Sequence, residues 1–337
     1  MRTTALLLAL ILCTAVFAAP SYHVIKKIPL GGEGGWDYLT VDSAANRLYI
    51  SRGTHVMVLD TVTDKLVGDI PDTAGVHGIA IAPELGRGFT SNGRANTSTI
   101  FDLNTLKPLG TVNTGENPDC ILYEPRTQRV FTFNGRSNDA TAFNATTGEV
   151  LATIPLGGKP EFAQADGRGN VFVNVEDTNQ LFEIDARTLE AGKPWSLKPG
   201  DSPTGMGLDA RRHRVFSVCG NQLMTILDAR KGAMLTTLPI GKGADGAGFD
   251  PGLGYAFSSN GGDGTLTVVQ ETSRGKFAVV QTAKTQRGAR TMAVDPATHK
   301  VYVVTAKFGP MPAGAVAGPR QRPPMVKDSF MVLVVGE

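Results

Sequence analysis

An aromatic residue recurs along this chain seven times at nearly constant spacing. The repeated positions are Tyr49, Phe89, Phe131, Phe172, Phe216, Phe257 and Tyr302, and successive members lie 40 to 45 residues apart. Each aromatic residue sits in an apolar segment that follows a turn, as expected for one strand of a repeated unit. A period of about 40–45 residues is the length of a four-stranded propeller blade. The spacing therefore predicts an all-β fold, a seven-bladed β-propeller of four-stranded blades.

The first repeat shows how four strands fit one period. Apolar segments separated by turns predict strands over residues 38–41, 47–51, 55–59 and 65–70. An Asx-type residue follows the third strand of five repeats, where its side chain caps the next turn. These residues are Asp60, Asp102, Asn144, Asp185 and Asp228.

The two ends of the chain predict how the ring closes. The last repeat runs out after a third strand over residues 329–335, and residues 24–32 resemble the fourth strand of the third repeat, residues 150–158. An N-terminal strand that completes the last blade removes two exposed sheet edges, which otherwise favour aggregation. A long array of two-sheet sandwiches is the rival architecture, and it does not explain this displaced strand.

Composition agrees with a globular β protein. The chain has 337 residues, of which 40 are Gly and 20 are Pro, so long helices are not expected. It is 41% hydrophobic and 19% charged, which provides a core and argues against disorder. The formal net charge of +2 gives no overall field for nucleic acid, and no nucleic-acid partner is expected. We expect one propeller domain over residues 19–337 and a monomer.

The first 18 residues are typical of a cleaved signal peptide. A basic residue precedes the apolar run 5–16, and cleavage is expected after Ala18. The run is shorter than the ~20 residues of a membrane span, and no later run reaches that length. We therefore expect a periplasmic or secreted protein without a membrane span. The repeat places Cys120 and Cys219 in different blades, so both are expected to be buried and unpaired.

Polar residues occupy one position at the start of the innermost strand in all seven repeats. They are Asp37, His77, Asp119, Glu161, Thr204, Asp245 and Arg290. The innermost strands of a propeller line its central channel, so these side chains are expected to form a ring at one mouth, which we call the mouth ring. Crowded carboxylates raise one another's pKa values unless a cation balances them.

Three interpretations of the mouth ring stay open. The ring binds a small solute, a peptide or a protein partner in the central funnel without chemistry, which we favour. Alternatively, Asp37, Asp119 and Glu161 hold a divalent cation such as Ca²⁺ or Mg²⁺ in a metal-assisted, lactonase-like hydrolase or lyase. In the third interpretation the side chains only hydrogen-bond backbone and water, and Arg290 pairs with Asp37. No recognised catalytic motif is present, and a cofactor is not required.

One loop is too long for a hairpin. Residues 306–328 in the last repeat are rich in Gly and Pro and carry Lys307, Arg320 and Arg322. This composition predicts either a lid over the funnel or a disordered arm that binds a partner.

The strand sequences of the repeats resemble a known family. The segments 47–51, 129–134, 213–218 and 300–305, which read RLYIS, RVFTFN, HRVFSV and KVYVVT, are similar to those of the YVTN-repeat, YncE-like bacterial propellers. The resemblance covers nearly all of residues 19–337 and implies a bacterial protein of the periplasm or cell surface. Repeats four and six depart from it, because Gly169-Asn170 and Gly254 replace the basic residue before the aromatic strand.

Overall fold

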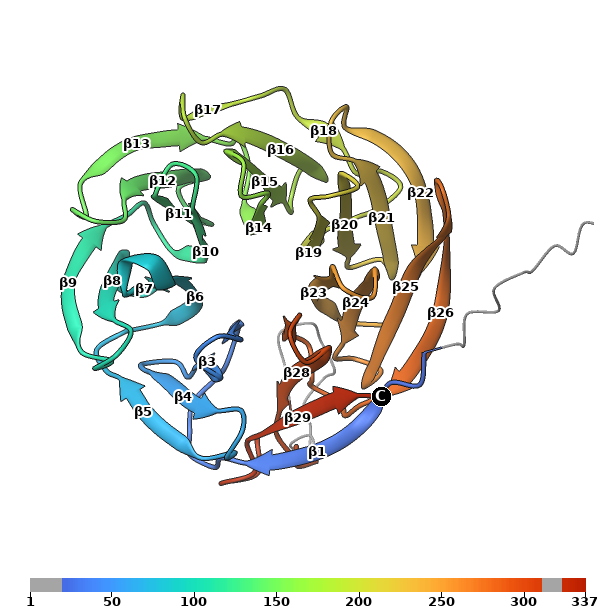
Figure 1. Ribbon diagram of the computed structural model, residues 1–337, viewed down its shortest axis with the longest axis horizontal. Coiled ribbons are helices and arrows are strands. Elements are labelled where there is room, and N and C mark those ends of the chain that lie inside the picture. Colours follow the sequence, from blue (N-terminus) through green and yellow to red (C-terminus); the bar gives the residue numbers. More distant parts are fainter. Residues whose placement is uncertain (1–19, 311–322) are drawn as a thin grey trace, which may run out of the picture.

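A computed structural model describes residues 20–310 and 323–337. It contains seven antiparallel sheets arranged radially in a ring around a central channel (Figure 1). The predicted seven-bladed propeller is therefore confirmed. In the described part of the chain, the one helix is a short 3₁₀ turn, η1 (Pro83–Leu85), and no helix has the length and apolar character of a membrane span.

The blades follow one another in chain order, and each is given from its innermost strand outward. Blade 1 contains β2 (Leu39–Asp42), β3 (Arg47–Ser51), β4 (Val56–Asp60) and β5 (Leu66–Ile70). Blade 2 contains β6 (Val76–Ala82), β7 (Arg87–Asn92), β8 (Thr97–Asp102) and β9 (Pro108–Asn113). Blade 3 contains β10 (Pro118–Glu124), β11 (Arg129–Asn134), β12 (Asp139–Asn144) and β13 (Val150–Pro155).

The remaining blades continue the ring. Blade 4 contains β14 (Pro160–Ala165), β15 (Asn170–Val175), β16 (Gln180–Asp185), β17 (Glu190–Ala191) and β18 (Trp195–Ser196). Blade 5 contains β19 (Pro203–Asp209), β20 (Arg214–Cys219), β21 (Leu223–Asp228) and β22 (Ala233–Pro239). Blade 6 contains β23 (Ala244–Asp250), β24 (Tyr255–Asn260), β25 (Thr265–Ser273) and β26 (Lys276–Lys284). Blade 7 contains β27 (Met292–Asp295), β28 (Lys300–Thr305), β29 (Met331–Gly336) and β1 (His23–Pro29).

Blade 7 is closed by the N-terminal strand, as predicted. Strand β1 pairs antiparallel with β29, from His23 opposite Gly336 to Pro29 opposite Met331. Figure 1 shows β1 in blue along the outside of β29 in red. The two ends of the chain thus lock the ring through backbone hydrogen bonds.

Blade 4 departs from the four-strand prediction. Its outer strand is split into β17 and β18, which pair with opposite ends of β16. The sequence Gly192-Lys193-Pro194 lies between them. Pro194 has no N–H to donate to the sheet, so the strand bulges away at this point.

The core lies between neighbouring blades. Seven clusters of buried side chains occur in the described residues, one at each junction of adjacent blades. The seven repeated aromatic residues are all buried, which explains their spacing. Cys120 and Cys219 are buried and unpaired, as expected. The Asx residues also cap their turns; for example, Asp60 Oδ1 accepts hydrogen bonds from the backbone of Val62 and Thr63.

Two predicted segments fall partly or wholly outside the described residues. The signal peptide, residues 1–18, lies outside them, and so does the central part of the 306–328 loop. The described ends of this loop pair with each other, because Phe308 bridges Met325 and Gly309 N donates to Pro324 O.

Candidate functional site at the channel mouth

The mouth ring forms where the innermost strands begin. His77, Asp119 and Asp245 lie in the first residues of β6, β10 and β23, whereas Asp37 and Arg290 just precede β2 and β27. Because consecutive blades repeat the same strand geometry, equivalent positions converge on the channel. Direct contacts link the ring members of blades 6, 7, 1, 2 and 3, while Glu161 in blade 4 has its own partners.

One side of the mouth ring is a chain of ion pairs. Arg290 bonds Asp245 through Nη1, and its Nη2 lies 3.1 Å from Asp37 Oδ1. The other oxygen of Asp37 lies 2.6 Å from Nδ1 of His77. The pair of Arg290 with Asp37 is the contact expected from a structural role. On this side every charged member of the ring has a partner of opposite charge.

Asp119 is less well satisfied. It is 8% exposed, and no described residue donates a hydrogen bond to its buried Oδ1. The nearest cation is His77, whose Nδ1 lies 3.5 Å from Oδ1 and is already engaged by Asp37. A buried carboxylate oxygen without a donor is unfavourable unless it is protonated or finds a ligand.

The structure adds a lysine to the blade 4 part of the ring. Lys159 Nζ lies 2.8 Å from Glu161 Oε2 and also bonds Glu176. The ammonium group of Lys159 therefore lies between two carboxylates, those of Glu161 and Glu176. In blade 5, Thr204 directs its hydroxyl to backbone carbonyls and leaves this part of the ring uncharged.

The pKa values follow from this uneven pairing. Burial, followed by the negative charges of Glu161 and Asp37, raises the pKa of Asp119 to about 8. Burial of His77 opposes its charged form, but the hydrogen bond to Asp37 and the nearby carboxylates outweigh it and raise the pKa of His77 to about 9. Burial also disfavours the charge of Asp37, yet Arg290 and His77 hold the pKa of this group below its ordinary value.

Glu161 is intermediate between these cases. Burial raises the pKa of Glu161, and the positive charge of Lys159 offsets this effect only in part. The two separate groups of ion pairs together contain five carboxylates, including Glu176, and three cationic groups, His77, Lys159 and Arg290. The mouth ring carries an excess of negative charge when its carboxylates are ionised.

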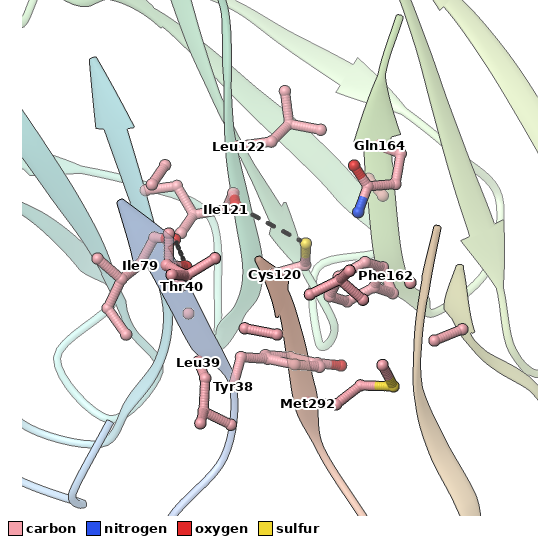
Figure 2. A pocket seen from close by; sticks show the side chains of 18 of the residues that line it. Tyr38, Leu39, Thr40, Ile79, Cys120, Ile121, Leu122, Phe162, Gln164 and Met292 are labelled. Carbon is pink, nitrogen blue, oxygen red and sulfur yellow. Dashed lines mark hydrogen bonds between the residues drawn. The ribbon is translucent and has the colours of Figure 1, made fainter. Parts of the chain in front are cut away.

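Two aromatic rings meet across the channel, each one residue after a member of the mouth ring. Tyr38 from blade 1 contacts Phe162 from blade 4, with ring centroids 4.9 Å apart, although these blades lie across the channel from each other. A chamber of about 370 Å³ continues toward the opposite mouth (Figure 2), and its walls include Cys120, Gln164 and Met292. The pair of Tyr38 and Phe162 thus lies between the mouth ring and this chamber, and we call it the aromatic floor.

A second cavity adjoins the mouth ring at blades 6, 7 and 1. It has a volume of about 500 Å³, and we call it the loop cavity. Its walls include Gly35, Trp36, Arg287, Arg290, Phe308 and Met325. Arg290 belongs to both the mouth ring and the loop cavity, so the two sites share a wall.

Several of these functional residues were not predicted from the sequence. The repeat does not identify Lys159, because this residue lies two positions before Glu161, in the loop between blades 3 and 4. Arg52 and Tyr38 carry clearer signals: Arg52 stands where repeats two, three and six have Asn, and Tyr38 stands where three repeats have Gly. A buried residue that differs from its equivalents in the other repeats makes contacts that the other blades do not make.

Comparisons with known proteins show the fold alone. No family model matches the chain, and no curated protein matches it. Among solved structures, a chain of Kuenenia stuttgartiensis hydrazine synthase is 15% identical, with a TM-score of 0.70 over 88% of this chain and 96% of that one. The WD40 repeats of RRP9 are 9% identical, with a TM-score of 0.75 over 94% of this chain and 99% of that one. Both similarities agree with the seven-bladed propeller.

Proposed function

We propose that this propeller is a binding protein that holds a small, positively charged solute in its mouth ring. The observation that carries the proposal is the buried Asp119 carboxylate, whose Oδ1 has no hydrogen-bond donor among the described residues. A ligand ammonium group supplies both the missing donor and the missing positive charge. The aromatic floor of Tyr38 and Phe162 stops such a ligand from passing down the channel.

Charge removal at constant shape tests this proposal. Ethylamine serves as the probe, and isothermal titration calorimetry measures its affinity. Replacing Asp119→Asn together with Glu161→Gln keeps the side-chain shapes and removes two ionisable carboxyl groups. We expect at least a tenfold loss of ethylamine affinity.

A matched control removes two other carboxylates from the same two blades, 3 and 4. Glu149→Gln with Glu190→Gln changes two exposed side chains, one just before the outer strand β13 of blade 3 and one in β17 of blade 4. This variant is expected to bind ethylamine as the parent does. Equal affinity in the mouth-ring variant and the parent would refute the proposal.

A metal-assisted hydrolase or lyase is the second candidate. Asp37, His77 and Asp119 offer one ligand atom each, all within 4.8 Å of one another. One imidazole and two carboxylates suit Mn²⁺ or Zn²⁺ better than Ca²⁺ or Mg²⁺, which prefer oxygen ligands alone. A bound ion would polarise a substrate carbonyl, and His77 and Asp37 would hold it only by giving up their mutual hydrogen bond.

Metal titration distinguishes the two candidates. A stable complex with Mn²⁺ or Zn²⁺, weakened by His77→Gln and accompanied by lactone hydrolysis, favours the enzyme. Ethylamine binding that persists in the presence of a chelator favours the solute-binding protein.

We also propose that the protein is an exported member of the YVTN-repeat, YncE-like propellers. The apolar N-terminal run and the strand sequences support this assignment. The mature protein recovered outside the cytoplasm is expected to begin at Ala19. Recovery of a chain that retains Met1 from the cytoplasm would contradict export.

A further inference from the structure

The chamber on the far side of the aromatic floor is a second space in the channel. It has a volume of about 370 Å³, and innermost strands of all seven blades contribute to its walls (Figure 2). It extends to Tyr123 and Pro296, which adjoin the last residues of β10 and β27 at the opposite mouth. A ligand can therefore reach the chamber from the opposite mouth without passing the aromatic floor.

The chamber differs from the mouth ring in its charge. None of the described residues that line it has a charged side chain. Many of its side chains are apolar, among them Ile121, Phe249 and Met292. An ion that enters such a space loses hydration without gaining a partner of opposite charge, so its binding is unfavourable. The lining therefore favours an uncharged ligand.

Backbone groups give the chamber hydrogen-bonding capacity. Each innermost strand is the end strand of its sheet, so no strand of that sheet pairs with its channel side. Backbone N–H and C=O groups on that side need water or a ligand as partners. Gln164 adds a side-chain amide, whose Nε2 lies 3.5 Å from Met206 O. Apolar walls with a few uncharged donors and acceptors are typical of sites for small molecules.

Tyr38 places a hydroxyl group at the floor of the chamber. Its side chain is buried, with 6% exposed, and within the described part of the chain its phenol oxygen makes no hydrogen bond. Burial, followed by the negative charges of Glu161 and Asp119, raises the pKa of the Tyr38 phenol well above its ordinary value. The phenol therefore keeps its proton and can donate it to an acceptor oxygen. A buried hydroxyl without a partner is unfavourable, so a ligand acceptor stabilises it.

Three residues of the chamber depart from the propeller repeat. Gln164 stands where four other blades have Gly or Ala, and Tyr38 and Phe162 stand where three blades have glycine, namely Gly78, Gly205 and Gly246. A Cβ atom at Gly205 would lie 2.5 Å from the backbone of the next blade, so these junctions leave no room for a side chain. Tyr38 and Phe162 instead extend across the channel and contact each other. The fold accepts Gly or Ala at these positions, so the larger residues are a specific feature of this chamber.

We propose that the chamber binds a compact, uncharged cyclic compound that carries a carbonyl group. The carbonyl oxygen accepts a hydrogen bond from the hydroxyl of Tyr38, and the ring packs against the apolar walls. A carbonyl oxygen suits this position because it is an acceptor without a hydrogen of its own. The site is separate from the mouth ring and goes beyond the proposed function.

Three probes of nearly equal shape test the preference for an uncharged ligand. At neutral pH benzamide is uncharged, benzoate is an anion and benzamidine is a cation. Isothermal titration calorimetry with the full chain measures the three affinities. We expect benzamide to bind at least tenfold more tightly than either ion. A smaller preference, or no binding of benzamide, overturns the inference.

Removal of one oxygen atom locates the bound probe. Tyr38→Phe keeps the aromatic ring and removes the hydroxyl, and it is expected to weaken benzamide binding at least fivefold. Tyr255→Phe is the matched control, because Tyr255 in β24 is 9% exposed and does not line the chamber. It is expected to bind benzamide as the parent does. Unchanged affinity in Tyr38→Phe overturns the inference.

A second substitution leaves Tyr38 in place. Gln164→Trp puts a larger side chain in the wall of the chamber, at a position that is only partly buried. The lost volume is expected to weaken benzamide binding at least fivefold. If Tyr38→Phe does not fold, this variant decides the inference, and unchanged affinity overturns it.

Competition with ethylamine separates the chamber from the mouth ring. If ethylamine binds, saturating ethylamine is expected to change the Kd of benzamide by less than threefold. Displacement of benzamide would place both probes in the mouth ring and overturn the inference, while the proposed function stands. If ethylamine does not bind, the proposed function fails, and the Tyr38 and Gln164 variants decide the inference by themselves.

Discussion

The two sides of the mouth ring use equivalent backbone positions in opposite ways. On blades 6, 7, 1 and 2, Asp245, Arg290, Asp37 and His77 form one continuous series of ion pairs. On blade 3, Asp119 occupies the same position with a buried oxygen that receives no hydrogen bond from residues 20–310 or 323–337. The paired side links four consecutive blades through ion pairs, whereas the unpaired side is where we propose that a ligand binds.

This difference shows that a repeat positions residues but does not decide their chemistry. The propeller brings seven equivalent side chains to one mouth, and the identity of each neighbour then determines whether a carboxylate is neutralised. Burial raises the pKa of both Asp37 and Asp119, but Arg290 and His77 reverse the effect at Asp37, whereas the negative charges of neighbouring carboxylates add to it at Asp119.

Among the substitutions, one that breaks the paired side is expected to have the largest effect. Arg290→Met leaves Asp37 and Asp245 partly buried without their shared cation. Loss of one partner of a largely buried ion pair costs about 3 kcal/mol of unfolding free energy. Chemical denaturation of the parent and the variant measures this cost. Arg290→Lys keeps the charge and is expected to lose less, and a change below about 0.5 kcal/mol in Arg290→Met would show that the pairs do not stabilise the ring.

The pH dependence of stability tests the boundary between the two sides, where His77 lies 3.5 Å from Asp119. His77 has a folded pKa of about 9 against an ordinary 6.5, so its contribution is complete below 6.5 and is lost as the pH rises through 9. Asp119 keeps its proton in the folded protein up to about pH 8, whereas the unfolded chain releases it near 3.8. Both groups therefore make the protein less stable as the pH rises.

Thermal and chemical unfolding between pH 5 and 9 measure this trend. We expect unfolding free energy to fall by several kcal/mol over this interval, because each group keeps a proton in the folded protein across more than two pH units in which the unfolded chain has lost it, at about 1.4 kcal/mol per pH unit. Stability that is constant or rises across the interval would contradict the assignment of raised pKa values to both groups.

Most of the fold followed from the sequence because a propeller repeats its strand pattern. The aromatic spacing gave the number of blades, and the strands of the first repeat were predicted within one residue of β2 to β5. The split outer strand of blade 4 was missed, because Pro194 interrupts one copy of an otherwise regular pattern.

The candidate site was predictable in position but not in pairing. The repeat located every member of the mouth ring, and it placed Arg290 beside Asp37. It did not reveal that Lys159 contacts Glu161 from the preceding loop. It also did not reveal that the guanidinium of Arg52 donates hydrogen bonds to backbone oxygens. Such contacts depend on side-chain direction and loop path, which a single sequence does not specify.

Neutralising the unpaired carboxylate is expected to stabilise the protein at high pH. Asp119→Asn removes a charge that is unfavourable above pH 8, so at pH 9 it should raise unfolding free energy by about 1 kcal/mol. At pH 5 the parent already carries a proton on Asp119, and the difference is expected to be much smaller. Destabilisation by Asp119→Asn at pH 9 would mean that the ionised carboxylate has a cationic partner.

The smallest effect is expected at Glu161, which shares the unpaired side with Asp119 but has a lysine beside it. Glu161→Gln removes one of two carboxylates around Lys159, and Glu176 still neutralises the ammonium group. Loss of one ion pair and relief of one buried charge then oppose each other. We expect a change within about 0.5 kcal/mol at pH 9, measured by denaturant titration beside Asp119→Asn. If Glu161→Gln stabilises the protein as much as Asp119→Asn does, Lys159 does not neutralise Glu161, and the unpaired side extends over both blades 3 and 4.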